Sequence, residues 1–344
     1  MDAAATIVTT PLADREGPTP SARSIATRPG LPDRIFHGGT SAISLTVLAS
    51  MVAIGVFLTV EALDALRVTG PVKFLTTSKW EPGSGTFGIK AVLLLGIMIA
   101  LVAMAIAVPV AMGAALFITE VAPRKLRPAL VAMIDLMATV PSVVYGIWGA
   151  SFLQPRIVGV SRWLSTWFGW IPIFKVDGYD ARNPLSNASV FTASTFICGV
   201  VVAMMAIPIA CSVMREVFSQ VPVGEREGAF ALGATRWGMI RIVTLPFGRG
   251  GIVGGTMLGL GRALGETIAV ALIASPRFDI SFHVLEAGAN SVAFLIANQV
   301  LEASSLGLSA LMAAGLALFV VTLIVNFAAS AVIARSRSGA GSEA

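Results

Sequence analysis

Six long apolar stretches, separated by polar connections, dominate the pattern of this 344-residue chain. Each is long enough for a helix to cross a hydrocarbon core of about 30 Å. Pro109, Pro141 and Pro208 fall inside them, which membrane helices tolerate where neighbours satisfy the freed backbone groups. We therefore expect an all-α membrane protein with six transmembrane helices. They are predicted at approximately 40–65, 89–118, 129–152, 189–213, 250–274 and 306–333.

The composition agrees with this prediction. Charged residues make up 12% of the chain and hydrophobic residues 56%, whereas a soluble domain carries ~25% charged residues. A soluble enzyme and a disordered protein are therefore excluded. Cys198 and Cys211 lie 13 residues apart, about 20 Å along a helix, which is too far for a disulfide. The lysines and arginines are spread between the apolar stretches, where they fix membrane orientation and do not indicate nucleic-acid binding.

The basic residues also predict which side the connections face. Six spans leave both termini on one side, and placing them inside gives fourteen Lys and Arg residues in inner segments against nine in outer ones. We therefore expect both termini in the cytoplasm. Residues 1–38, rich in proline and without the apolar core of a signal peptide, are predicted to form a flexible cytoplasmic tail. Residues 39–86 would hold the first transmembrane helix and an outer loop, and 334–344 a second tail.

Three tryptophans in the outer loop 153–188 follow a helical spacing. Trp163, Trp167 and Trp170 stand at i, i+4 and i+7, which predicts three indoles on one face of a short helix. Such a face is typical of a helix anchored among the lipid headgroups. A docking surface for a partner protein is the less favoured alternative.

Motifs for catalysis or cofactor binding are not supported. Residues 83–88 read GSGTFG, which fits a dinucleotide fingerprint. That fingerprint binds a dinucleotide only inside a βαβ unit, whereas this segment opens a membrane helix, so we expect a flexible turn. No segment fits a Walker-type phosphate loop, and His37 and His283 stand apart from any nucleophile or metal-ligand partner. We therefore expect no catalytic residue, metal or cofactor in this chain, and ATP with Mg²⁺ would be bound by a partner ATPase.

The longest charged connection, residues 214–249, contains a pattern for two short helices. Glu225 to Leu232 are predicted to be helical, with acids in the first turn that complement the helix dipole. Gly233 can end this helix in a left-handed conformation, Thr235 can cap a second helix, and Pro246 is expected to stop it. The result is a compact cytoplasmic projection, here called the foot (residues 225–246). An ordinary solvated loop is the alternative.

The foot resembles the EAA loop of ABC-importer permeases, whose pattern is E-A-A, three residues, G, nine residues, I, one residue, L-P. The spacing is kept throughout, with Gly228 in place of alanine and Val243 in place of isoleucine. In that family the loop sits in a cleft of the ATPase and transmits its closure to the membrane helices. The resemblance therefore implies a type I ABC importer permease (MetI-like) fold over residues 87–333. The residues that it assigns to ATPase coupling are Glu227, Gly228, Ala229, Gly233, Ala234, Thr235, Leu245 and Pro246.

Two charged residues lie inside the fifth apolar stretch. Arg262 and Glu266 are spaced i and i+4, which predicts one helix face with Cβ atoms ~6 Å apart. An ionisable residue at this depth costs about 2.5–3.5 kcal/mol, so it normally faces a bundle interior or water. We interpret the pair as a substrate-pathway site, in which Arg262 binds an oxyanion and Glu266 weakens this binding so that the anion can leave. A neutralising pair that stabilises packing is the alternative. Nearby glycines should let helices approach closely, namely Gly254, Gly255, Gly259, Gly261 and Gly265.

The surrounding segments resemble one family in particular. Four segments are similar to the PstC-type permease of phosphate-specific transport systems: ALFITEVAP (115–123), VPSVVYGIWG (140–149), IPIACSVMREVFSQVP (207–222) and GLGRALGETIAV (259–270). The resemblance implies half of a phosphate channel in the bacterial cell membrane, paired with a PstA-type permease. Two PstB-type ATPases and a PstS-type phosphate-binding protein would complete the transporter.

Two other interpretations stay open. The chain could be a permease for another oxyanion, such as sulfate or molybdate, because substrate discrimination belongs mainly to the binding protein. It could also be a signalling subunit that reports phosphate status. Asp135, a second intramembrane acid, is predicted to pair in a buried position with a basic residue of the partner permease, or to support Arg262.

Overall fold

The computed structural model describes residues 30–179 and 188–337, and the chain divides into two compact units, 1–53 and 54–344. The described residues of the first unit form the beginning of α1 (Leu31–Thr69). The carboxylate of Asp33 in the first turn accepts the backbone N–H of Gly30 at 3.2 Å, which favours a helix start at this point. The predicted tail 1–38 is therefore helical from Leu31. Its residues 1–29, and residues 338–344 of the second tail, lie outside the described residues.

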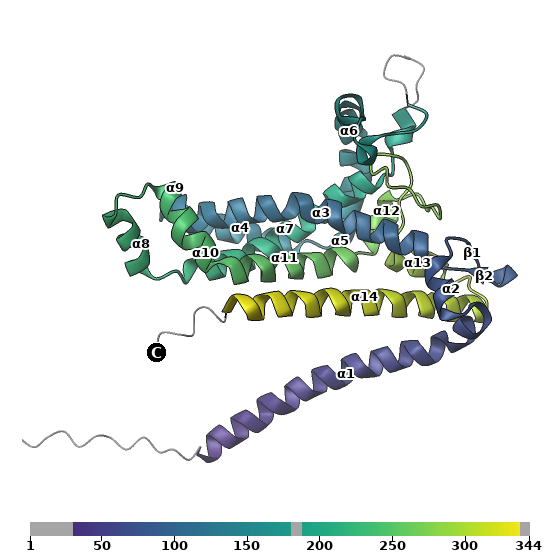
Figure 1. Cartoon of the computed structure of the whole chain (residues 1–344), viewed down its shortest axis with the longest axis horizontal. Coiled ribbons are helices and arrows are strands. Elements are labelled where there is room, and N and C mark those ends of the chain that lie inside the picture. The colour runs from purple at the N-terminus through teal and green to yellow at the C-terminus, as the bar shows by residue number, and fades with distance from the viewer. Residues whose placement is uncertain (1–29, 180–187, 338–344) are drawn as a thin grey trace, which may run out of the picture. The chain divides into compact units, whose positions relative to one another are not determined.

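The second unit contains the other helices, which Figure 1 labels. The long ones are α3 (Lys90–Leu116), α7 (Thr195–Ser219) and α14 (Ser305–Arg337). The shorter ones are α2 (Pro71–Thr76), α4 (Arg127–Thr139), α5 (Ser142–Trp148), α6 (Gln154–Phe168), α8 (Val223–Ala231), α9 (Arg236–Met239), α10 (Leu245–Phe247), α11 (Arg249–Leu264), α12 (Ile268–Ile273) and α13 (Val292–Gln299).

Several helices are extended or joined by turns of different pitch. Three are π-helical turns, at Phe117–Val121, Gly149–Leu153 and Ile240–Thr244. Three are 3-10 turns, at Pro82–Ser84, Pro172–Phe174 and Ala188–Phe191. A small antiparallel hairpin pairs β1 (Trp80–Glu81) with β2 (Thr86–Phe87). The glycine-rich segment 83–88 therefore supplies part of the turn and also strand β2, and is not the simple flexible turn that was expected.

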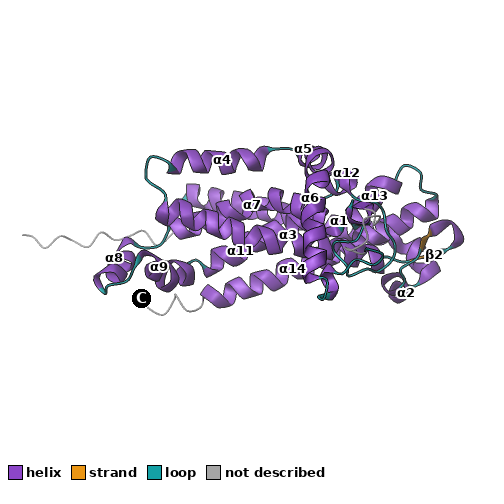
Figure 2. Cartoon of the chain, turned by 90° about the horizontal axis from the view of Figure 1, so that it is seen from above, coloured by secondary structure: helices purple, strands orange, loops and turns teal. Residues whose placement is uncertain are grey.

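α3 and α7 pack against each other at the centre of the second unit, and α11 packs beside both (Figures 1 and 2). Their shared core is built largely from alanine and β-branched side chains, and Ala103 and Val201 are fully buried in it. Small side chains bring the helix axes close together, which is the usual way in which membrane helices gain packing energy.

A row of glycines on α11 allows this approach. A Cβ atom added to Gly251 would lie 2.6 Å from the side chain of Val217 on α7. Added to Gly255 or Gly259, it would lie 2.8 Å or 3.0 Å from its nearest neighbour. The expected close packing is therefore confirmed at Gly255 and Gly259. It is wrong at Gly261, where nothing lies within 4 Å.

Two of the six predicted spans are broken. The third bends by 89° between α4 and α5, because Val140 adopts an extended backbone before Pro141. The fifth is interrupted by residues 265–267, which separate α11 from α12. Among the described residues, four helices are long and apolar enough to cross a membrane, or five if the bent pair counts as one span. Six continuous spans are therefore not reproduced.

The outer-loop helix α6 lies crosswise to α3 and α7 in both views (Figures 1 and 2). Trp163 and Trp167 are exposed on it, but Trp170 lies beyond its last residue, Phe168. The prediction of three indoles on one helix is therefore wrong, because the helix ends at Gly169. A crosswise helix with exposed indoles suits an interfacial anchor, and the choice between anchor and docking surface stays a prediction.

Candidate functional site

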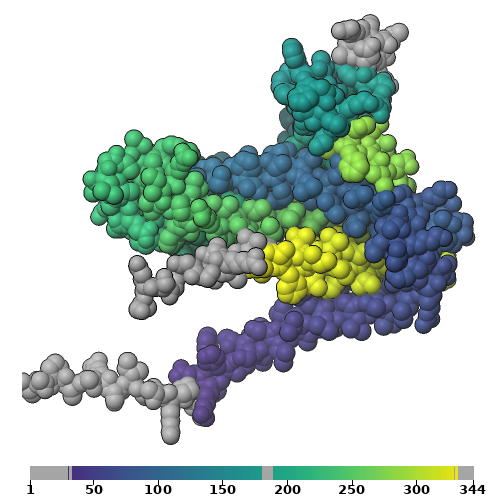
Figure 3. Space-filling view, in the orientation of Figure 1, coloured from purple at the N-terminus to yellow at the C-terminus, as the bar shows by residue number. Residues whose placement is uncertain are grey.

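The foot folds as two short helices, and Figure 3 shows it in green as a lobe at one end of the second unit. Gly233, after α8, has φ +83°, the left-handed conformation that glycine adopts without strain. The hydroxyl of Thr235 accepts the backbone N–H of Gly238 at 3.1 Å and so caps α9. Both local predictions are confirmed.

Pro246 does not stop the second helix, contrary to the prediction. The chain continues from α9 through the π-helical turn Ile240–Thr244 into α10, where Pro246 lies in the first turn. A first-turn N–H has no helical acceptor, so the missing donor of proline costs little there. The helical path is interrupted only at Gly248, and α11 begins at the next residue.

The surface of the foot is apolar in a way that a simple solvated loop would not be. Leu232 is 91% exposed and Trp237 is 64% exposed. Gly228, Ala229 and Pro246 line a groove of about 460 Å³ between α8 and the segment that follows α9. The remaining predicted coupling residues are exposed or half-buried on the foot, namely Glu227, Ala234 and Leu245. Large exposed apolar groups gathered in this way mark a protein-interaction surface.

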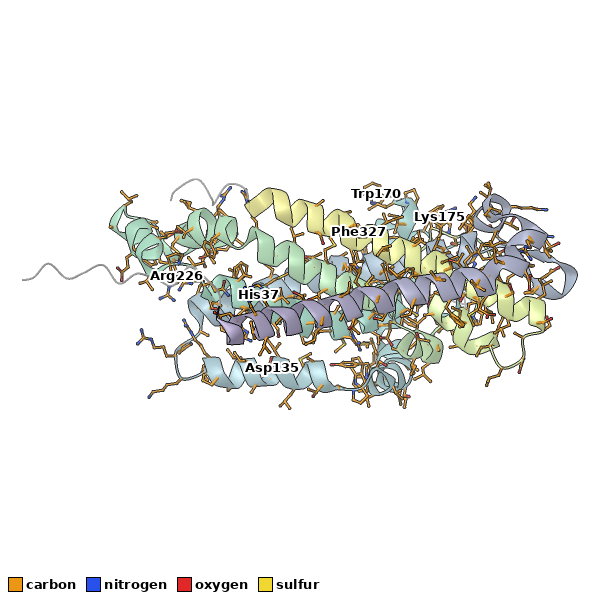
Figure 4. All side chains as sticks on the ribbon, turned by 90° about the horizontal axis from the view of Figure 1, so that it is seen from below. His37, Asp135, Trp170, Lys175, Arg226 and Phe327 are labelled. Carbon is orange, nitrogen blue, oxygen red and sulfur yellow. The ribbon has the colours of Figure 1, made fainter. Side chains whose placement is uncertain are left out.

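A buried carboxylate joins the foot to the bundle. Glu120, in the π-helical turn after α3, has a side chain only 4% exposed and lies 3.1 Å from the guanidinium of Arg226 on α8, which Figure 4 labels. The hydroxyl of Thr244 donates to the same carboxylate at 3.3 Å. Arg226 also donates to the backbone carbonyl of Phe218, near the end of α7, at 2.8 Å. Glu120, Arg226 and Thr244, here called the clamp, tie the foot to the ends of α3 and α7.

Arg262 and Glu266 meet at the break in the fifth span. Arg262 lies in the last turn of α11, whereas Glu266 lies in the segment between α11 and α12. One carboxylate oxygen of Glu266 accepts the backbone N–H of Ala269 at 3.2 Å, and the other lies 3.9 Å from Arg262 Nη2. The expected single helix face is therefore wrong, because Gly265 ends the first helix. The ion pair still forms, at a long distance.

The Arg262 side chain reaches an open groove. It is 41% exposed, whereas that of Glu266 is 6% exposed. The groove has a volume of about 460 Å³, and Asn326 and Ser330 of α14 line it together with Arg262. Sequence reasoning did not single out these two residues, although they are polar groups inside the last apolar stretch. A guanidinium, an amide and a hydroxyl around an open groove are suited to binding an oxyanion.

The acidic residues that the structure describes offer no metal site. Across 30–179 and 188–337, no three His, Cys, Asp or Glu side chains come together in a way that could hold a metal ion. Asp135 is exposed on α4 (Figure 4), and no basic group of the described residues lies within 4 Å of its carboxylate. Its pairing with a partner permease stays a prediction.

The fold and the foot define a class of protein. Residues 107–338 match the family described as "Binding-protein-dependent transport system inner membrane component". Among solved structures, a bacterial alginate ABC transporter bound to its pentasaccharide-loaded periplasmic protein has a TM-score of 0.55 at 15% identity, covering 87% of this chain and 94% of that chain. A bacterial ABC transporter involved in the import of alginate has a TM-score of 0.52 at 17% identity, covering 88% and 99%. The class is therefore the multi-pass membrane component of an ABC importer.

Sequence relatives narrow this class. "Phosphate transport system permease protein PstC 2" of Mycobacterium tuberculosis is 38% identical over 304 residues, covering 87% of this chain and 91% of the relative. "Phosphate transport system permease protein PstC" of Mycobacterium leprae is 38% identical over 320 residues, covering 92% and 97%. The protein of that name from Xylella fastidiosa strain Temecula1 is 37% identical over 319 residues, covering 92% and 95%. The chain belongs to the PstC family of ABC-importer permeases.

Proposed function

We propose that this chain is one permease subunit of an ATP-driven phosphate importer in the bacterial cell membrane. It forms half of the translocation pathway with a PstA-type permease. Two PstB-type ATPases, which bind ATP and Mg²⁺, lie below the two permeases, and the foot sits in a cleft of the ATPase. A PstS-type protein delivers phosphate from outside. Both termini lie in the cytoplasm, on the side of the foot. The observation that carries the proposal is Arg262 at an open groove, in a chain that belongs to the PstC family.

The chemistry of Arg262 suits an anion in transit. Its guanidinium presents N–H donors in a planar fork that matches two oxygens of a phosphate. Glu266 lies 3.9 Å away, beyond hydrogen-bond distance, and directs its other oxygen to α12, so it neutralises the cation only in part. Asn326 can donate to a further phosphate oxygen, and Ser330 can do so when its hydroxyl turns from the Asn326 backbone carbonyl to which it donates at 2.9 Å. A partly neutralised cation binds an anion without trapping it.

The foot supports coupling to ATP hydrolysis in another chain. Seating it in a cleft of the ATPase would bury Leu232 and Trp237, which are exposed in this chain. The clamp at Glu120 would then pass a displacement of the foot to α3 and α7. Rocking of the two permeases against each other would open the pathway to alternate sides.

Uptake of [32P]phosphate by vesicles that hold the complete transporter tests the pathway. Arg262→Ala is expected to abolish uptake while the complex still assembles. Arg262→Lys should keep part of the uptake, because the charge remains and the planar fork is lost. Glu266→Gln should keep the cap on α12 through its amide oxygen. It removes the opposing charge, so phosphate should leave more slowly and uptake should fall less than in Arg262→Ala.

Arg156→Gln is a matched control, because it removes an exposed arginine of α6 that does not line the groove. Its uptake should equal that of the wild type. Equal uptake by Arg262→Ala and the wild type would remove Arg262 from the pathway and leave it a packing role. Transport of sulfate or molybdate without phosphate by the wild type would replace phosphate as the substrate.

A further inference from the structure

A polar pocket lies at the base of the foot and shares no lining residue with the Arg262 groove. Its volume is about 220 Å³. Three arginines from three helices line it: Arg127 of α4, Arg215 of α7 and Arg226 of α8. Thr119 and Ser219 add hydroxyl groups, and none of the described residues that line it is acidic.

The three guanidinium groups offer more donors than this chain uses. Arg226 Nε is buried without a hydrogen-bond partner, although Nη2 of the same side chain binds Glu120. Arg127 donates Nε to the carbonyl of Ala122 at 3.1 Å. For Arg215 no hydrogen bond or ion pair is formed with any described residue. Buried polar groups are normally satisfied, so the unpaired Nε of Arg226 points to an acceptor from outside the described residues, and the half-buried Arg127 and Arg215 can donate to the same acceptor.

The charges near the pocket favour an anion. Glu120 neutralises one of the three arginines. Glu216, next to Arg215 on α7, is exposed and accepts a hydrogen bond from Gln220 at 3.3 Å. Asp135 lies eight residues beyond Arg127, about 12 Å further along α4, and it pairs with no described basic residue within 4 Å.

The connection that leads into α4 adds to the positive field. Arg124 and Lys125 are exposed in it, just before Arg127. Basic groups at the end of membrane helices attract anions from the adjacent solution and from anionic lipid. Guanidinium forks that converge from different helices match the several oxygens of a tetrahedral phosphate group.

We propose that this pocket binds a phosphate group, supplied as inorganic phosphate from the cytoplasm or as the headgroup of an anionic phospholipid. The two sources present the same tetrahedral oxyanion. Both can reach the pocket if the foot faces the cytoplasm, and this orientation rests on the proposed function. A bound phosphate group links α4 and α7 to α8, so it holds the foot against the bundle. The site is distinct from the transport pathway.

Calorimetric titration of inorganic phosphate tests the first source. It uses the assembled complex without the binding protein and with Arg262→Ala, which removes the pathway site. We expect saturable binding that is weakened at least about tenfold by Arg127→Gln or Arg215→Gln. Arg215→Lys, which keeps the charge but loses the fork, should weaken it less. Arg124→Gln is the matched control, because it removes a charge from the same connection without lining the pocket, and it should weaken binding much less than the two pocket variants do.

Native mass spectrometry of complexes from nanodiscs of phosphatidylcholine, with and without phosphatidylglycerol, tests the second source. The wild type and Arg124→Gln should retain phosphatidylglycerol, and Arg127→Gln and Arg215→Gln should lose it. Phosphate binding that depends on these arginines assigns the site to free phosphate, and dependent lipid retention assigns it to lipid. The proposal is overturned if neither ligand responds to Arg127 and Arg215 more than to Arg124.

Thermal unfolding of every variant shows which ones fold, and Arg215→Lys stands in for any glutamine variant that does not. Transport is measured separately by the uptake assay. Phosphate or lipid binding at this pocket can therefore be judged even if the proposed phosphate transport fails.

Discussion

Replacing Glu120 by glutamine should loosen the foot from the bundle. Removing one partner of a fully buried ion pair costs about 3–5 kcal/mol, because the other charge is left without compensation. Here the Glu120 side chain is 4% exposed, but that of Arg226 is 23% exposed and keeps its 2.8 Å bond to the Phe218 carbonyl. Glutamine can also still accept from Thr244. We therefore expect a loss of about 2 kcal/mol in unfolding free energy for Glu120→Gln.

A double-mutant cycle of Glu120→Gln and Arg226→Gln isolates the interaction between the two side chains. Its coupling energy, from denaturant unfolding in detergent, should be about 1–2 kcal/mol. The matched control is the surface pair Asp64–Arg67, at 3.6 Å with side chains 78% and 73% exposed. A cycle of Asp64→Asn and Arg67→Gln should give about 0–0.5 kcal/mol.

The same variant reports on coupling. In vesicles, the Glu120→Gln complex should continue to hydrolyse ATP, while phosphate uptake per ATP falls. The clamp would be refuted as a link if the Glu120–Arg226 cycle gave no more coupling than the Asp64–Arg67 cycle, or if uptake per ATP stayed at the wild-type level.

Two glycine substitutions extend the test, with the same unfolding assay. Gly255→Ala should destabilise the chain by about 1–3 kcal/mol, because its Cβ would lie 2.8 Å from the backbone carbonyl oxygen of Ala210. Gly113→Ala is the control, because nothing lies within 4 Å of the Cβ that it adds. Equal stability of the two variants would contradict the packing argument. Gly228→Ala in α8 should stabilise the foot by about 0.5–1 kcal/mol and retain uptake, because the space around it is open; loss of uptake would show that the foot needs a glycine there.

The hydropathy pattern predicted the positions of the membrane helices well, but it did not predict their bends. The stretches predicted at 89–118 and 189–213 correspond to α3 and α7, because both are continuous apolar helices. The bend at Pro141 and the break after Gly265 were missed. A count of apolar residues does not register backbone direction, and Pro109 and Pro208, which sit inside unbroken helices, show that a proline alone does not predict a bend.

In the candidate site, too, some residues could be predicted from the sequence and others could not. Gly233 and Thr235 could be placed from the sequence because a helix end and a cap depend on residues a few positions away. Glu120 could not, since its hydroxyl donor, Thr244, lies 124 residues further along the chain. Asn326 likewise reaches the Arg262 groove only because α14 lies beside α11.

α11 runs from the foot to the Arg262 groove. It begins at Arg249, two residues after the last helix of the foot, and ends two residues after Arg262. Its 16 residues rise about 24 Å. Gly251 and Gly255 leave its backbone in close contact with α7, whose Val217 and Met214 side chains pack against the two glycines. Packed helices can shift by small sliding movements along one another. A shift of the foot would then move Arg262 by a similar distance, while the break at Gly265 lets α12 stay in place.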